Sequence, residues 1–130
     1  MAYKGSQPFK ITLNAGADLS SSQYHFVKLD ASGNAVECAA TTDKPVGVLQ
    51  NKPTSGNQAE IVVIGVTKAS ADAAVVAGAQ LGAAADGQVV TYVAGTDTTK
   101  GLVGQAITSA GAAGVIFTAI VNCVAQNRGA

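Results

Sequence analysis

Charged residues are scarce in this chain of 130 residues. Asp, Glu, Lys and Arg together make up 12% of it, about half of the ~25% found in an average soluble domain. The eight basic and eight acidic side chains cancel, and neither sign is gathered into a block. Proteins that bind nucleic acids carry a basic excess because they neutralise phosphates. The composition therefore argues against a nucleic-acid partner.

Side chains that carry out chemistry are equally few. His25 is the only histidine, so a serine or cysteine nucleophile that needs a histidine base would have to use it. An enzyme would need a cleft that brings His25 to two carboxylates. Together with Cys38 and Cys123, His25 makes a poor start for a zinc site, which takes three or four ligands. We expect no catalytic residue, no metal site and no cofactor, and hence a protein that is not an enzyme.

Long apolar segments are also missing. The longest apolar run, from Val115 to Val124, is interrupted by Thr118 and Asn122 and falls short of the ~20 residues that a membrane-spanning helix needs. The opening MAYKGSQPFK has no apolar stretch of the kind found in secretion signals. We expect no membrane partner and a product made in the cytoplasm. Cys38 and Cys123 are then expected to be buried free thiols, with a disulfide between them as the alternative.

Short stretches rich in β-branched and aromatic residues dominate the sequence. Each is bounded by Gly, Asn, Asp, Thr or Pro, which is typical of strands joined by turns. The pattern predicts an all-β protein, a β-sandwich or a barrel-like fold with at most one or two short helices. We divide the chain into an extended N-terminal arm (1–8), a single β-domain (9–125) and a C-terminal tail (126–130). The expected strands are 9–13, 23–29, 34–38, 46–50, 58–66, 88–93, 101–107 and 114–124.

The alanine-rich stretch 68–87 is ambiguous, because alanine favours helix whereas its three glycines oppose a long one. We expect a short helix or turn over 69–77, followed by extended chain. A faint internal echo is also present: AGADL (15–19) resembles AGAQL (77–81), and GVLQ (47–50) resembles GQAI (104–107). Either this is coincidence in a chain rich in small residues, or two similar β-units fold against each other.

Two of the expected strands, 58–66 and 114–124, are apolar on both faces. A strand with one solvated face would alternate polar and apolar residues. These strands are therefore either central in the sheet or partly covered by another subunit.

The first eight residues show no periodicity and end at Pro8, just before the first strand. They could be a disordered terminus. Alternatively they form an arm that contacts the capsid or a neighbouring subunit, with Tyr3 as its anchor. The candidate contact residues of this arm are Ala2, Tyr3, Lys4, Gln7 and Pro8.

Nearly the whole chain resembles the capsid cement, or head decoration, proteins of tailed bacteriophages. The segments that carry the resemblance are QPFKITLNAGADLSSSQYHFVKLDASGNAVECAA, TTDKPVGVLQNKPTSGNQAEIVVIGVTK and GQAITSAGAAGVIFTAIV. None of them is a catalytic signature, and the family offers no active-site motif to carry over to this chain.

The resemblance implies a compact β-domain on the outer surface of a virion capsid, made in the cytoplasm of the host. Its implied partners are the major capsid protein and further copies of itself, as a homotrimer at threefold positions. It would clamp neighbouring capsomers and thereby stabilise the mature shell. The alternative is the base of a head fibre or spike that recognises a host surface or glycan.

Overall fold

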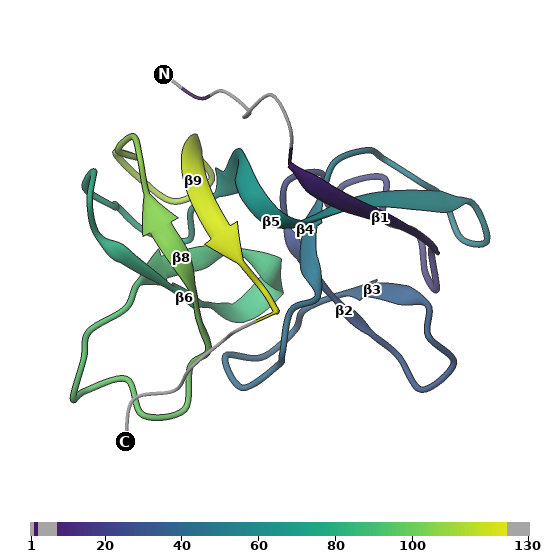
Figure 1. The fold of residues 1–130 in the computed structure, drawn as a ribbon, viewed down its shortest axis with the longest axis horizontal. Coiled ribbons are helices and arrows are strands. Elements are labelled where there is room, and N and C mark those ends of the chain that lie inside the picture. Colours follow the sequence, from purple (N-terminus) through teal and green to yellow (C-terminus); the bar gives the residue numbers. More distant parts are fainter. Residues whose placement is uncertain (1, 3–7, 125–130) are drawn as a thin grey trace.

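The computed structural model describes residues 2 and 8–124, and over these residues the protein is almost entirely β-sheet (Figure 1). The expected all-β class is thus confirmed. One 3₁₀ turn, Ala85–Gly87, is the helical element among the described residues. The strands are β1 (Phe9–Asn14), β2 (Phe26–Leu29), β3 (Ala35–Glu37), β4 (Gly47–Leu49), β5 (Gln58–Ser70), β6 (Gln80–Ala83), β7 (Val89–Thr91), β8 (Leu102–Ala106) and β9 (Ile116–Asn122).

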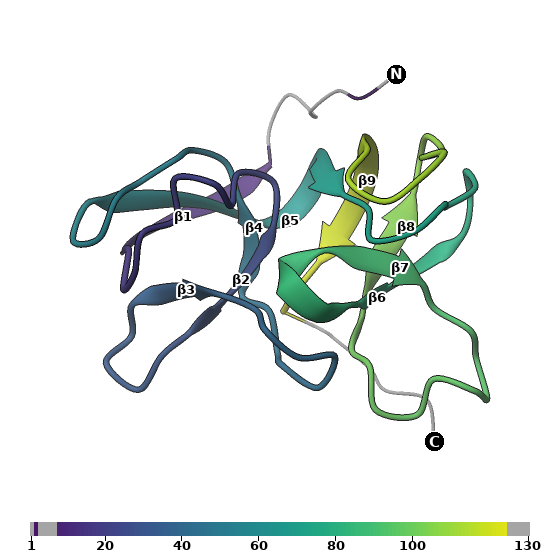
Figure 2. The same ribbon diagram turned by 180° about the vertical axis from the view of Figure 1, so that it is seen from behind.

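Strand β5 is the longest and holds the sheet together. The strand order is β3-β2-β4-β5-β9-β8-β6-β7, and β1 pairs with β5 beside this path. The N-terminal half of β5 pairs with β1 and β4, whereas its C-terminal half pairs with β9. Figures 1 and 2 show the result, which is two curled groups of strands on either side of β5.

Each group closes on itself through a backbone hydrogen bond. In the first unit, formed by β1 to β4 and the N-terminal half of β5, the Gly16 N–H donates to the Ala35 carbonyl at 2.8 Å. In the second unit, formed by the C-terminal half of β5 and β6 to β9, the Asp72 N–H donates to the Val89 carbonyl at 2.8 Å. Both closures are parallel bridges between segments that follow or precede a strand. Closing a curled sheet in this way removes free strand edges.

The two units have the same topology, strand for strand. β1 corresponds to the C-terminal half of β5, β2 to β6, β3 to β7, β4 to β8 and the N-terminal half of β5 to β9. The register agrees as well: the pair Lys10–Val62 in the first unit matches the pair Val66–Ile120 in the second, 56 and 58 positions later. Of the two readings of the internal echo, the structure therefore follows the second, two similar β-units folded against each other.

The backbone hydrogen bonds repeat in detail. The Tyr24 N–H donates to Leu49 and the equivalent Gly78 N–H to Ala106, at 2.7 and 2.8 Å. Tyr24 has a positive φ of 66°, and Gly78 has one of 88°, so the repeat extends to an unusual backbone conformation. Further equivalent pairs are Cys38→Phe26 with Tyr92→Gln80, Gln50→Glu60 with Ile107→Thr118, and Leu19→Pro53 with Val75→Ala110.

One half of the sequence echo was aligned correctly and the other was not. GVLQ and GQAI do coincide, because Gly47 of β4 and Gly104 of β8 occupy equivalent places in their ladders. The alignment of AGADL (15–19) with AGAQL (77–81) is wrong, because Ala15 corresponds to Ala71 in the structure. The shared letters reflect a chain rich in alanine and glycine.

The expected helix or turn over 69–77 is also wrong as a helix. Residues 69 and 70 continue β5, where they pair with Phe117 and Ile116 of β9. Ala69 and Ala71 are fully buried, so their small side chains serve the packing of the second unit. Tertiary packing has overridden the helical propensity of alanine here. The extended chain expected after this stretch contains β6.

Two hydrophobic clusters form the core. The cluster of the first unit consists of its own inward side chains, Ala15, Leu19, Val27, Ala35, Leu49, Ala59, Ile61 and Val63. The cluster of the second unit is larger, because four buried residues of the first unit join it: Phe26, Cys38, Val48 and Val62. The two units therefore share apolar contacts in addition to β5.

Polar contacts also join the units. The Gln50 side chain donates from Nε2 to the Thr67 hydroxyl at 2.9 Å, and both residues are buried. The Ser70 N–H donates to the Tyr24 carbonyl at 3.1 Å. Buried polar groups that find partners across a boundary fix the arrangement on either side of it.

Candidate interaction surfaces

The N-terminal arm meets the domain at Pro8. Of the five candidate arm residues, Ala2 and Pro8 are described, and both are half-buried. Tyr3, Lys4 and Gln7 lie outside the described residues. Pro8 packs directly on Gly65 of β5, where an added Cβ would come within 2.9 Å of the Pro8 Cα. Gly65 has φ +136°, a conformation that suits glycine, so this position leaves room for Pro8 against the strand.

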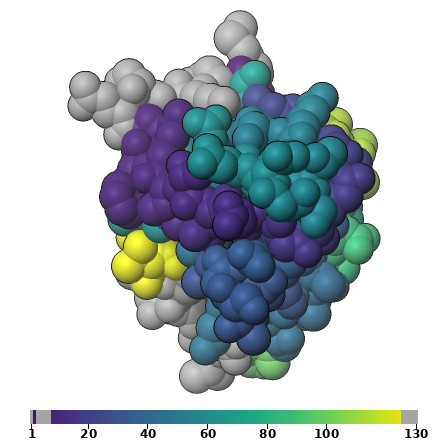
Figure 3. All heavy atoms as spheres, turned by 90° about the vertical axis from the view of Figure 1, so that its right-hand side faces the viewer, coloured from purple at the N-terminus to yellow at the C-terminus, as the bar shows by residue number. Residues whose placement is uncertain are grey.

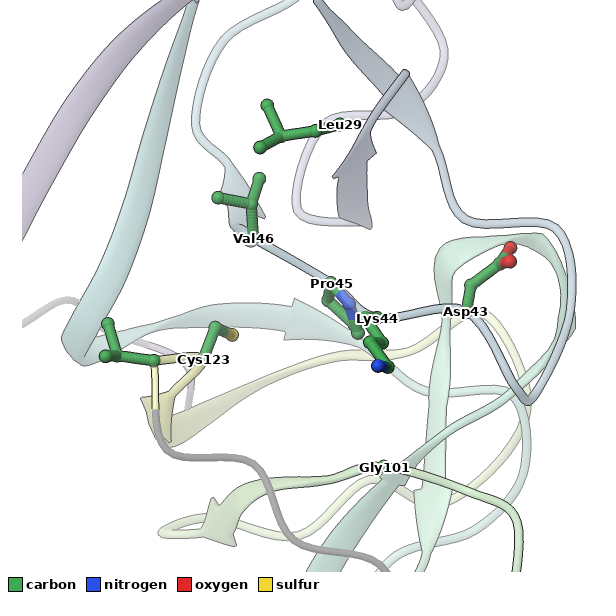
Figure 4. Close-up of a pocket in the computed structure, with 8 residues that line it drawn as sticks. Leu29, Asp43, Lys44, Pro45, Val46, Gly101 and Cys123 are labelled. Atoms are coloured by element: carbon green, nitrogen blue, oxygen red, sulfur yellow. The ribbon is translucent and has the colours of Figure 1, made fainter. Parts of the chain in front are cut away.

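A groove of about 540 Å³ runs between the two units (Figure 4). The first unit contributes Leu29, Pro45 and Val46, which are apolar, and the charged pair Asp43 and Lys44. The second unit contributes Gly101, Cys123 and Val124. The groove thus combines an apolar wall with a charged rim, an arrangement suited to a peptide segment or a protein loop.

Asp43 is held in place by its neighbours. Its Oδ2 accepts the backbone N–H groups of Ala39 and Ala40 at 2.8 and 3.0 Å, and it forms an ion pair with the Lys28 ammonium at 3.0 Å. The Ala39 N–H is the main cause of a pKa below the usual range for this carboxyl group, against the opposing effect of burial. Asp43 is therefore ionised at neutral pH.

The two cysteines are free thiols, as expected, and both are buried. Burial raises the pKa of Cys38 and of Cys123 to about 12. A thiol is a nucleophile only as its thiolate, so both groups remain protonated and unreactive at neutral pH.

His25 lies at the contact between the two units. Its Nδ1 is 2.9 Å from the Glu37 carboxylate and 2.8 Å from the Asp86 carbonyl oxygen. Both of these neighbours are acceptors, so Nδ1 carries the proton and donates. His25 and Glu37 belong to the first unit, and Asp86 belongs to the β6–β7 turn of the second. The histidine therefore has a structural role at this contact. Over residues 2 and 8–124, no three His, Cys, Asp or Glu side chains form a group that could hold a metal ion.

A second groove, of about 440 Å³, lies on the outer side of β8 and β9. Its floor includes Gly65, Leu102 and Gly104, and its apolar walls include Ile64 and Ile120. Ile64 is 39% exposed and Ile120 is 46% exposed. Phe9, which pairs with Ile64, is 57% exposed. Three large apolar side chains that neighbour one another at the surface mark a contact site more often than a solvated face.

The two strands expected to be apolar on both faces differ in their surroundings. β5 is central, with paired strands along both halves, which accounts for its apolar character. β9 lies between β5 and β8, and it still exposes Ile116 and Ile120. Figure 3 shows the yellow end of the β9 segment at the surface below the purple β1. Cover by another subunit remains the explanation to consider for β9.

No described helix is long and apolar enough to cross a membrane. No protein-family model and no curated protein matches the chain. Among solved structures, the chain is similar to one described as the head fiber gp8.5 N base of bacteriophage phi29. The TM-score is 0.66 at 17% sequence identity, and the likeness covers 90% of this chain and 96% of that one. The protein therefore shares its fold, from end to end, with the base of a bacteriophage head fibre.

Proposed function

We propose that the protein is a structural, non-enzymatic component of a bacteriophage virion that binds the outer surface of the capsid. The observation that carries this proposal is the end-to-end likeness in fold to a phage head fibre base. The sequence resemblance to phage cement proteins points to the same location and rests on different grounds, because it was drawn from residue patterns and not from the fold.

In its specific form, the proposal is that the protein clamps neighbouring copies of the major capsid protein. Contacts that exist in the mature shell and are missing in its precursor stabilise the mature form by mass action. Many weakly bound copies on one lattice act together. Self-association as a homotrimer at threefold positions would let each site engage several capsomers.

The exposed apolar side chains supply contact area for this role. Phe9, Ile64 and Ile120 lie side by side at the surface, next to the point where the arm leaves the domain at Pro8. Burying a large apolar side chain contributes about 1.5–3 kcal/mol. Contacts of this size allow three residues and an arm to hold a subunit on a shell.

A second candidate function is the base of a head fibre or spike that recognises a host surface or glycan. The printed description of the structural neighbour favours it, since that protein is a head fibre base. Both candidates bind the head, and they differ in whether binding strengthens the shell.

Heads that lack the protein separate the two candidates. Purified protein is added to such heads, and both its saturable binding and the temperature of genome release are measured. A cement raises the release temperature as its sites fill, whereas a fibre base binds with no change in that temperature. If saturable binding is absent, both candidates are wrong.

The arm provides a sharper test of the contact. Deleting residues 2–7 retains Pro8 on Gly65, so we expect an almost unchanged melting temperature. Binding to heads should weaken at least tenfold, or about 1.4 kcal/mol, because an extended segment can add backbone hydrogen bonds at a sheet edge and Tyr3 can bury a large area. If the truncated protein binds as tightly as the full chain, the arm has no part in the contact.

A further inference from the structure

The internal repeat places two equivalent rows of side chains on the two units. In the first unit, cross-strand pairing aligns Phe26, Val48 and Val62 across β2, β4 and β5. In the second unit, it aligns Gln80, Gln105 and Ile120 across β6, β8 and β9. The first row is buried, with exposures of 1%, 0% and 0%. The second row is exposed at all three positions, and its apolar member Ile120 is 46% exposed.

The second unit covers the first row. Phe26, Val48 and Val62 belong to the hydrophobic cluster of the second unit. The β6–β7 turn lies on the end of this row, where an added Cβ on Gly87 would be 2.9 Å from the Phe26 carbonyl oxygen and 3.0 Å from the His25 Cβ. The fold thus contains one complete example of a unit docked by its turn onto the row of its neighbour.

The counterpart of that turn is unused in the first unit. Gly33 in the β2–β3 turn is equivalent to Gly87, with φ +82° against +72°, and nothing lies within 4 Å of an added Cβ there. Leu29, at the end of β2, is 50% exposed, whereas its equivalent Ala83 is 2% exposed. One chain therefore presents an uncovered row at one end and an uncovered turn at the other.

We propose that copies of this chain associate head to tail, with the β2–β3 turn of one copy on the Gln80–Gln105–Ile120 row of the next. The contact within the chain is the template, and the occupant of the row is a second copy. A head-to-tail contact is heterologous, so it closes into a ring when its rotation permits. The proposal specifies the surface for the self-association in the proposed function, but it does not depend on capsid binding.

The composition of the open row agrees with a contact that forms and separates. The buried row has phenylalanine and valine where the open row has two glutamines, which tolerate water when the contact is absent. Ile120, with the neighbouring Ile64, keeps an apolar centre. A polar rim around an apolar centre is the usual anatomy of an interface between separately folded chains.

Cysteine pairing tests the register of the contact. Ala79 is equivalent to His25, so Gly33→Cys on one chain and Ala79→Cys on another should meet as Gly87 and His25 do. The two variants are mixed at high concentration under a mild glutathione redox buffer, and disulfide-linked heterodimers are counted on a non-reducing gel. Ser32→Cys replaces Gly33→Cys in a second mixture, since it avoids a side chain at a positive φ.

A matched control uses Ser55→Cys, an exposed turn position, mixed with Ala79→Cys. We expect at least fivefold more heterodimer in both test mixtures than in this control. Equal yields in all mixtures would overturn the proposal. Because the assay contains no capsids, a failure to bind heads and a failure of this contact are seen separately.

The apolar centre of the row gives an independent readout. Sedimentation velocity of the wild-type chain should show a mean size that increases with concentration. Ile120→Asp should abolish this increase. Val76→Asp, a control at another exposed apolar position (69% exposed), should retain it. If Ile120→Asp associates as the wild type does, the row is not the contact.

Discussion

At the scale of single residues, Gly87 and Gly33 are equivalent turn glycines that differ in what surrounds them. Replacing either with alanine places a Cβ at a positive φ, which costs about 1–2 kcal/mol. At Gly33 that is the whole cost, since the space around it is open. At Gly87 the new Cβ meets the Phe26 carbonyl and the Glu37 side chain within 2.9 Å, and overpacking adds about 1–3 kcal/mol. Urea denaturation should therefore show Gly87→Ala to be clearly less stable than Gly33→Ala.

Equal losses in the two variants would mean that the turn of the second unit is not packed on the first. The double variant provides a check, because the two sites are in different turns and their effects should add.

The Asp43 carboxylate makes stability depend on pH. Its folded pKa is lowered below the ordinary value of 3.8, so its contribution is fully present above about pH 4 and is lost as pH falls through the folded pKa. Asp43→Asn keeps an acceptor for Ala39 and Ala40 but has no charge to lose. Melting temperatures measured between about pH 7 and pH 2 should fall less steeply for this variant than for the wild type.

Some dependence on pH should remain in Asp43→Asn, because Asp18 and Asp97 also have lowered pKa values, caused by hydrogen bonds from Ser20 and from the Val93 N–H. A variant that follows the wild-type curve throughout would show that Asp43 has the same proton affinity in the folded and unfolded chain.

At the scale of elements, β5 joins the stability of the two units. Its 13 residues supply strands to both, so neither unit can unfold and leave the other with a complete sheet. We expect one cooperative transition, with equal calorimetric and van't Hoff enthalpies. The slowest backbone amides in hydrogen exchange should belong to β5, since they are released by global unfolding alone.

Chains cut between residues 64 and 65 test this dependence. Neither fragment should fold alone, because each loses half of the shared strand. Two separate thermal transitions in the intact protein, or a folded fragment, would show that the units are independent domains.

The strands were predictable from the sequence wherever packing and local preference agree. Alternation in residues 9–13 and the β-branched run 58–66 led directly to β1 and to most of β5. The stretch 68–79 failed because its alanines are small to fit the core of the second unit, as the burial of Ala69 and Ala71 shows. Sequence alone displays the helical propensity of alanine but not the neighbour that limits its size.

At the scale of the whole molecule, the surfaces were harder to predict than the fold. Both rows are built from residues on separate strands, and their meeting depends on register. A signal was present nonetheless: the alignment of GVLQ with GQAI places Val48 against Gln105, a change from apolar to polar at equivalent positions of a repeat. Such a difference marks the position at which two similar units have different neighbours. The exposure of Ile120 could not be foreseen, because its strand is apolar on both faces.

The pairing around Ile64 has a consequence for the connectivity of the chain. Phe9 and Asn122 are both cross-strand partners of Ile64, and since paired Cα atoms lie about 5.5 Å apart at most, these two residues are within about 11 Å of each other. A linker of about four residues spans that distance. The chain could therefore be circularly permuted, with new ends in the exposed turn at Gly56 or at its equivalent, Gly114. In a circle of two units neither is first, and the order found here reflects only where the circle is cut.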